Sequence, residues 1–196
     1  MNFFPPDPAE DEIEPANHVS QPWWKPSDGE LAAIFPVGET IAINDTVAVI
    51  LTMARVYSNG VEFAIDRRIR RGGTTRREWQ EMHNQMHGHF MGHDPDRLRY
   101  GAVLGDGQKL IADWSAGMFD SPPERHTLTQ TGGGGGGGED SYRFDDALWL
   151  WPLPPAGPIE VVVQWPALDV PESHVVLDSA PLIALAAQAR PVWSDA

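Results

Sequence analysis

TVAVILTMARVYSNGVEFAIDRRI, residues 46–69, decides the fold class of this chain. Its first half, 46–57, is a run of β-branched and apolar residues typical of a strand that is buried on at least one face. Residues 58–60 carry a turn signal, because Asn-Gly suits the positive φ angles of tight hairpins. The second half, 61–69, alternates apolar and polar side chains. The stretch therefore predicts a β-hairpin.

More strand patterns flank this hairpin, and a run of seven glycines, 132–138, interrupts them. Strands are predicted at 98–104, 108–114, 125–131, 142–151, 159–165 and 174–177. A glycine tract is typical of a linker between domains. However, the part of the chain after the tract holds little apolar material for a core of its own, whereas about eight strands together suit one domain. The sequence therefore predicts an all-β fold, a single two-sheet β-sandwich of immunoglobulin-like or jelly-roll topology over residues 31–196, with 132–138 as a loop.

The two ends of the chain differ from this β-rich middle. Residues 1–30 are acidic and proline-rich, and we expect an extended N-terminal arm. Within it, Trp23 and Trp24 are costly to expose to water, so this part of the arm is expected to dock on the chain's own sheet or on a partner. A short C-terminal helix is predicted at about 180–189, capped by Ser179. Its apolar stripe comprises Leu182, Ile183, Leu185, Ala186 and Ala189.

The composition narrows the classes of function. The chain has 196 residues, of which 41% are hydrophobic and 21% are charged, so it can bury one substantial core. It contains no cysteine, which excludes disulfides, thiolate metal sites and cysteine nucleophiles and fits a reducing compartment. Its net charge of −14 argues against a nucleic-acid partner. We find neither a signal peptide nor a membrane-spanning run, and expect a cytoplasmic protein.

Six arginines fall within eleven positions of the predicted hairpin's second strand and the residues after it: Arg67, Arg68, Arg70, Arg71, Arg76 and Arg77. The simplest interpretation is a solvated surface paired with the chain's own many carboxylates. The alternative is a site for an anion or an acidic partner. Binding of that kind would weaken steeply with added salt.

A histidine-rich segment follows, with His83, His87, His89 and His93 within eleven residues. A capping-box pattern, Thr75 with Glu78, predicts that a helix begins before them, with an apolar stripe through Trp79, Met82, Met86 and Phe90. On that helix the first two histidines are four residues apart and can share a metal such as zinc. Asn84 stands where zinc proteases carry glutamate, so a polar helix face without any metal is the preferred interpretation, and no cofactor is expected.

Other catalytic patterns find less support. Ser115 follows a predicted strand without a nucleophile-elbow motif or an identifiable base. Asp145 and Asp146 are adjacent on a predicted strand and should point to opposite faces, so they cannot act as a carboxylate pair. The glycine run leads into two acidic residues and not into the lysine of a phosphate loop. We therefore assign no catalytic residue.

Four stretches carry a likeness to other proteins: the glycine run at 132–138, LWLWPLPPAGP at 148–158, QWP at 164–166 and RVYSNGVEF at 55–63. They resemble a family of uncharacterised actinobacterial proteins. The likeness covers most of the chain after the arm. It implies no activity, cofactor or catalytic residue, and the histidine segment lies outside it.

The sequence leads to one preferred function and two alternatives. The preferred hypothesis is a non-enzymatic cytoplasmic binding or assembly protein, whose partner is an unidentified protein or a second copy, with Trp23 and Trp24 as contact residues. The first alternative is a metal-dependent enzyme or metal-binding protein that uses the four clustered histidines. The second is binding of an anion or nucleic acid by the six clustered arginines.

Overall fold

The computed structural model describes residues 20–88, 94–112 and 121–193, which form mainly strands. In chain order the elements are β1 (Glu30–Leu31), β2 (Ala33–Ile43), β3 (Val47–Val56), β4 (Val61–Arg70), α1 (Arg76–Gly88), β5 (Arg99–Val103), β6 (Lys109–Ile111), β7 (Thr127–Gly137), β8 (Ser141–Trp151), β9 (Pro158–Trp165), the 3-10 turn η1 (Pro166–Leu168), β10 (Val170–Asp178), α2 (Ser179–Ala186) and β11 (Arg190–Pro191). The described residues contain two α-helices, α1 and α2, and neither is long and apolar enough to cross a membrane.

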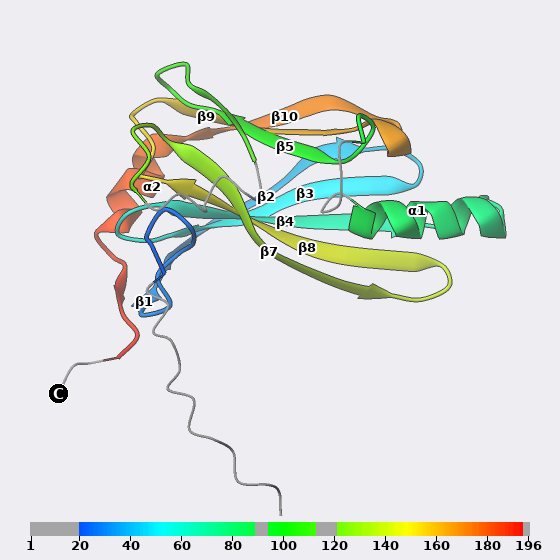
Figure 1. Cartoon of the computed structure of the whole chain (residues 1–196), viewed down its shortest axis with the longest axis horizontal. Helices are drawn as coiled ribbons and strands as arrows, with labels where there is room; N and C mark the ends of the chain where they lie inside the picture. The colour runs from blue at the N-terminus through cyan, green and yellow to red at the C-terminus, as the bar shows by residue number, and fades with distance from the viewer. Residues whose placement is uncertain (1–19, 89–93, 113–120, 194–196) are drawn as a thin grey trace, which may run out of the picture.

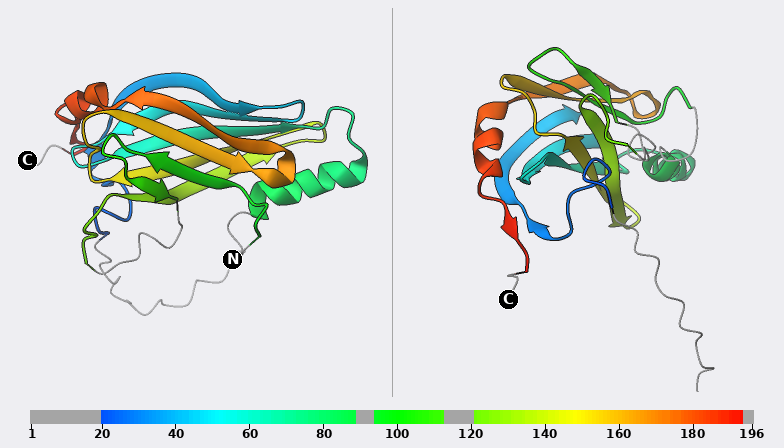
Figure 2. Two further views of the ribbon diagram at one scale, coloured as in Figure 1. Left: turned by 90° about the horizontal axis from the view of Figure 1, so that it is seen from above. Right: turned by 60° about the vertical axis from the view of Figure 1, so that its left-hand side comes forward.

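Two larger antiparallel sheets pack against each other. One has five strands in the order β2-β3-β4-β8-β7, and the other has four in the order β10-β9-β5-β6. A small ribbon pairs β1 with β11. Figures 1 and 2 show the four-stranded sheet lying over the five-stranded sheet, with α1 at one end and α2 at the other. Buried side chains of both sheets and both helices form a single apolar cluster, so the prediction of a mostly β fold with packed sheets is confirmed.

The predicted central hairpin is present as β3 and β4. Tyr57 donates its backbone N–H to the carbonyl of Gly60 at 2.9 Å, which closes the turn. The expected positive φ angles are absent at Asn59 and Gly60, and this part of the prediction is wrong. Gly60 is needed for a different reason: a Cβ there would collide with the indole ring of Trp149, so the ring packs directly on the glycine backbone.

The glycine run is not the loop that the sequence predicts. Six of its seven residues lie in β7, which pairs with β8 from Gly132 opposite Ala147 to Gly137 opposite Tyr142. The turn follows only at residues 138–140, where Gly138 donates to the carbonyl of Ser141. The ladder with β8 holds the glycines in extended form, although glycine itself has a weak preference for strands.

Both helices carry defined N-terminal caps. At α1 the capping box is confirmed, because the Thr75 N–H donates to the Glu78 carboxylate at 2.7 Å and the Glu78 N–H donates to the Thr75 hydroxyl at 3.3 Å. These bonds lower the pKa of Glu78, the larger cause being the bond from the Thr75 backbone. At α2 the cap is Asp178, which accepts from Ala180, and not Ser179 as expected. The Ser179 hydroxyl instead accepts from the N–H of Gly157.

Strand β2 was missed by the sequence patterns. It contains Pro36 and Gly38, both of which argue against a regular strand. Its pairing with β3 accommodates them through register shifts at 36–39 and at 40–42, and Gly38 adopts a φ of 73°. With β1 and β11 added, the described residues form three sheets where two were expected.

We expect alanine at two neighbouring glycines of β7 to have opposite effects on stability. A Cβ at Gly134 would have nothing within 4 Å. Gly134→Ala should therefore stabilise the protein by about 0.4–1 kcal/mol, because alanine lowers the conformational entropy of the unfolded chain. A Cβ at Gly135 would lie 2.6 Å from the ring of Phe144, so Gly135→Ala should destabilise it by about 1–3 kcal/mol. Urea unfolding of both variants measures the difference. Equal midpoints would contradict the strand assignment.

Candidate functional site

An arginine of the predicted cluster, Arg67, lies in the interior between the sheets. Its side chain is fully buried and forms a two-pronged ion pair with Asp146 of β8, with the second bond at 3.1 Å. Its guanidinium carbon lies 4.5 Å from the ring centre of Phe144 and 5.3 Å from that of Trp165. It also donates to the carbonyl of Met86 in α1, at 3.4 Å. The ion pair therefore joins strands of both sheets and α1.

Two further groups complete the hydrogen bonding of the Asp146 carboxylate. The Tyr100 hydroxyl donates to it from β5 at 2.6 Å, and the Gln130 amide donates to it from β7 at 3.0 Å. Burial raises the pKa of Tyr100 well above its ordinary value, and the charge of Asp146 adds to the effect. Because these groups are satisfied by each other, we interpret this network as structural.

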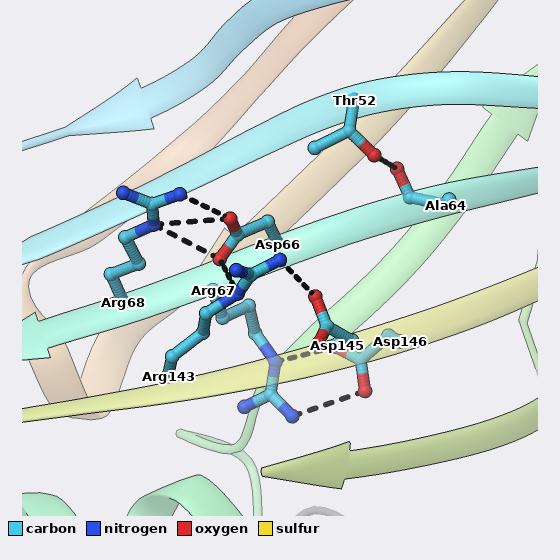
Figure 3. Close-up of polar contacts among 8 residues, drawn as sticks. All are labelled: Thr52, Ala64, Asp66, Arg67, Arg68, Arg143, Asp145 and Asp146. Atoms are coloured by element: carbon cyan, nitrogen blue, oxygen red, sulfur yellow. Dashed lines mark hydrogen bonds and ion pairs between the residues drawn. The ribbon is translucent and has the colours of Figure 1, made fainter. Parts of the chain in front are cut away.

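The six arginines do not form one surface. Arg68 points to the outer face of the five-stranded sheet, away from Arg67, as Figure 3 shows. Arg70 donates to the carbonyl of Asp45, whereas Arg71 lies in the turn after β4, and Arg76 and Arg77 begin α1. Arg67 therefore cannot belong to a common anion site, because strand alternation turns it to the buried face. For the other five arginines the anion site stays a prediction.

The outer face carries a quartet of alternating charges on β4 and β8. Asp66 stands opposite Asp145, and Arg68 stands opposite Arg143. Asp66 is nearly buried and accepts from Arg68 at 2.6 Å and from Arg143 at 3.2 Å, while Arg143 also pairs with Asp145 at 2.8 Å (Figure 3). As expected, Asp145 and Asp146 point to opposite faces.

The glycine strand β7 lies beyond this quartet, at the margin of the sheet. On its inner face, the rings of Tyr142 and Phe144 cover Gly133, Gly135 and Gly137, where a Cβ would collide with them. On its outer face, a Cβ at Gly132, Gly134 or Gly136 would meet nothing within 4 Å. The outer face of β7 is therefore a bare strip of main chain next to Arg143 and Asp145.

A hollow of about 410 Å³ lies over this part of the outer face. Its lining consists mostly of small or flexible residues on four neighbouring strands: Thr52, Met53, Arg55, Ala64, Ile65, Gly132, Gly133, Gly134, Arg143, Asp145, Asp146 and Ala147. The sequence patterns did not identify this hollow or the roles of Arg143 and Asp145. The available signal was the alternation of the predicted strand 142–151, which places Arg143, Asp145 and the small Ala147 on one face.

Trp23 docks on the chain's own sheet. It is buried, and its ring centre lies 5.9 Å from that of Trp151. The neighbouring Pro22 carbonyl accepts from the indole N–H of Trp149 at 3.0 Å. Trp24 is half-buried. Of the two interpretations of this segment, docking within the chain is confirmed for Trp23, and this residue is not available as a contact for a partner.

The histidines give no metal centre that can be described. His83 lies between two rings, 4.4 Å from that of Trp79 and 4.8 Å from that of Tyr142. His87 belongs to α1, while His89 and His93 lie outside the described residues. Among the residues that the structure describes, no three histidine or acidic side chains are placed to hold a metal. The metal hypothesis stays a prediction.

No family model, curated protein or solved structure matches this chain. The resemblance to an actinobacterial family therefore stays an expectation. In the chain itself, the bare edge of β7 and the hollow beside it are two features that the packing of the core does not use.

Removing one member of the buried ion pair should destabilise the fold strongly. Arg67→Met leaves the Asp146 charge buried without its cation, and we expect a loss of about 3–5 kcal/mol. The matched change Arg143→Met breaks an exposed ion pair with Asp145 and one of the two pairs of Asp66, which keeps Arg68, and should cost about 1 kcal/mol. Urea unfolding measures both free energies. If the two variants lose the same stability, the network is not the structural link described here.

The pH dependence of stability should reveal Tyr100. Its pKa is raised in the folded protein, so its contribution is fully present below the unfolded pKa of about 10 and is lost as the pH rises above that value. We expect the urea midpoint to fall between about pH 9.5 and 11, and to fall less in Tyr100→Phe, which cannot ionise. Parallel curves for the two proteins would show that the hydroxyl is not buried.

Proposed function

We propose that this protein is a non-enzymatic binding module that adds an extended segment of a partner protein to the edge of β7 with which no described strand pairs. The observation that carries the proposal is a long edge strand whose second half, residues 132–137, consists of glycine. An edge strand presents a row of main-chain N–H and C=O groups that pair readily with another strand. Strand addition of this kind is a common mode of peptide recognition.

The other sheet margins in the described residues carry features that discourage such pairing. Strand β2 contains Pro36 and two register shifts, and it lies near β10. Strand β10 contains Pro171 and a register shift, and β6 has only three residues. Strand β7 has a single register shift, before the glycines, and neither proline nor lysine. Natural proteins protect edges with proline, bulges, short strands and lysine, so the open edge of β7 supports a role in binding.

The glycines also make room for a second strand. A partner strand lies about 4.8 Å from β7, and its side chains stand beside those of β7 on each face. Because Gly132, Gly134 and Gly136 have no side chains, the partner's side chains meet no steric barrier on the outer face. Main-chain pairing provides affinity in this mode, and the partner's side chains provide selectivity.

A site-specific cross-linker tests the proposal in the native cell. The photoreactive residue p-benzoylphenylalanine at Glu139, an exposed position just past the end of β7, leaves the glycines unchanged and should form a covalent adduct with a protein partner. The matched control places it at Val176, which is 58% exposed on the other sheet. In the Glu139 protein, a second change, Gly136→Lys, should abolish the adduct, since lysine blocks edge pairing. No adduct at 139, or the same adducts from 139 and 176, would contradict the proposal.

A further inference from the structure

The outer face of the five-stranded sheet already holds one aromatic segment of the chain itself. Along β8 this face presents Arg143, Asp145, Ala147, Trp149 and Trp151 in alternate positions. The last two are covered by the segment around Trp23, as the indole bond to Pro22 and the ring contact of Trp151 show. The first three border the hollow of about 410 Å³, which no described side chain fills.

We propose that this hollow receives an aromatic side chain from a partner strand bound at β7; the inference rests on the proposed function above. The floor is made of Ala64, Ala147 and the glycine strand, which leave space above them. Its volume lies in the range of about 300–1,000 Å³ that is usual for ligand pockets. The socket, as we call this hollow, thus has the volume to hold a ring and lies within one strand of the edge.

The inner face of β7 shows how a ring crosses glycine. Phe144 of β8 reaches over the neighbouring strand, and its ring atoms lie 2.6 Å from where the Cβ atoms of Gly133 and Gly135 would be. On the outer face, a ring can cross β7 in the opposite direction. A side chain of a partner strand would pass over Gly132 and Gly134 and reach Ala147. Ring packing over edge glycines is a known means of stabilising a sheet margin.

Two arginines at the wall of the socket favour an aromatic occupant. Arg55 is 38% exposed and pairs with Glu62 at 2.6 Å, and Arg143 is 55% exposed. Because carboxylates already hold both guanidinium groups in place, their faces are ordered before a ring arrives. A guanidinium near a ring face adds a cation–π attraction to the burial of the ring.

Charge favours basic residues on either side of that ring. The chain carries a net charge of −14, which attracts cationic segments over long range. Near the edge, Asp145 is 62% exposed, and Glu139 and Asp140 lie in the turn after the strand. Between residues 127 and 140 there is no lysine or arginine. The partner is therefore a basic extended segment with an aromatic residue whose side chain faces the socket.

A set of three synthetic peptides tests the inference with the full chain. KTVTWTVTK places lysine, valine and tryptophan on one face of a strand; KTVTATVTK lacks the ring, and ETVTWTVTE reverses the end charges. Backbone NMR shifts of residues 132–137 report binding at the edge. We expect the first peptide to bind about tenfold more tightly than either of the others, from the loss of ring packing or of charge attraction.

Two variants separate the socket from the edge. Ala147→Leu fills the socket and should remove the preference for tryptophan while the glycine signals still shift. Gly134→Lys should abolish binding of all three peptides, with Gly134→Ala as its matched control for folding. Thermal unfolding of each variant verifies that its fold is intact.

The outcomes distinguish this inference from the proposed function. If the glycine signals shift equally with the tryptophan and alanine peptides, the socket is wrong and strand addition stands. If no peptide shifts these signals, both are wrong. Concentration-dependent shifts without peptide would identify a second copy as the occupant, and cross-peaks from Phe3 or Phe4 to Ala147 would identify the chain's own arm. Either result would overturn the basic aromatic partner.

Discussion

The ion pair between Arg67 and Asp146 is the interaction on which the arrangement of the sheets depends. A buried charge is tolerated only when its partners satisfy it, and here those partners come from β4, β5, β7, β8 and α1. The pair thus requires both sheets and the helix to be in place together. The directed bonds of this network add to apolar packing in setting the relative position of the sheets. A buried ion pair contributes little net stabilisation. The role that we assign to Arg67 is therefore to position the sheets and the helix.

The two faces of the glycine strand β7 differ in what they require of its residues. Its inner face must be glycine, because the rings of Tyr142 and Phe144 occupy the space that side chains would take. On its outer face, a Cβ at Gly132, Gly134 or Gly136 would meet no described atom within 4 Å. Packing among the described residues therefore accounts for the three inner glycines and does not account for these three. Contact with another strand is the explanation that uses the absence of side chains directly.

The features that the sequence predicts well are local. The central hairpin, the capping box of α1 and the opposite orientation of Asp145 and Asp146 each depend on residues that are close in the chain. The features it misses depend on distant partners. Strand β2 contains Pro36 and Gly38 and exists because β3 offers it a ladder. The sequence predicts Arg67 as a surface residue because its partner Asp146 is 79 positions away in the chain. It predicts the glycines as a loop because their pairing with β8 is not visible in their own composition. The hollow lies where four strands meet, so no single stretch of sequence indicates it.

The buried network and the open edge are physically linked. Gln130 of β7 donates to Asp146, and the ring of Phe144, which packs on Arg67, also lies over Gly133 and Gly135. Ordering a backbone costs about 1–2 kcal/mol per residue, and glycine is at the expensive end of that range. An edge made of glycine would therefore be a poor template if it were ordered only when a partner arrived. Because the network and the rings already hold β7 in extended form, folding bears this entropic cost, and a partner strand has only its own chain to order.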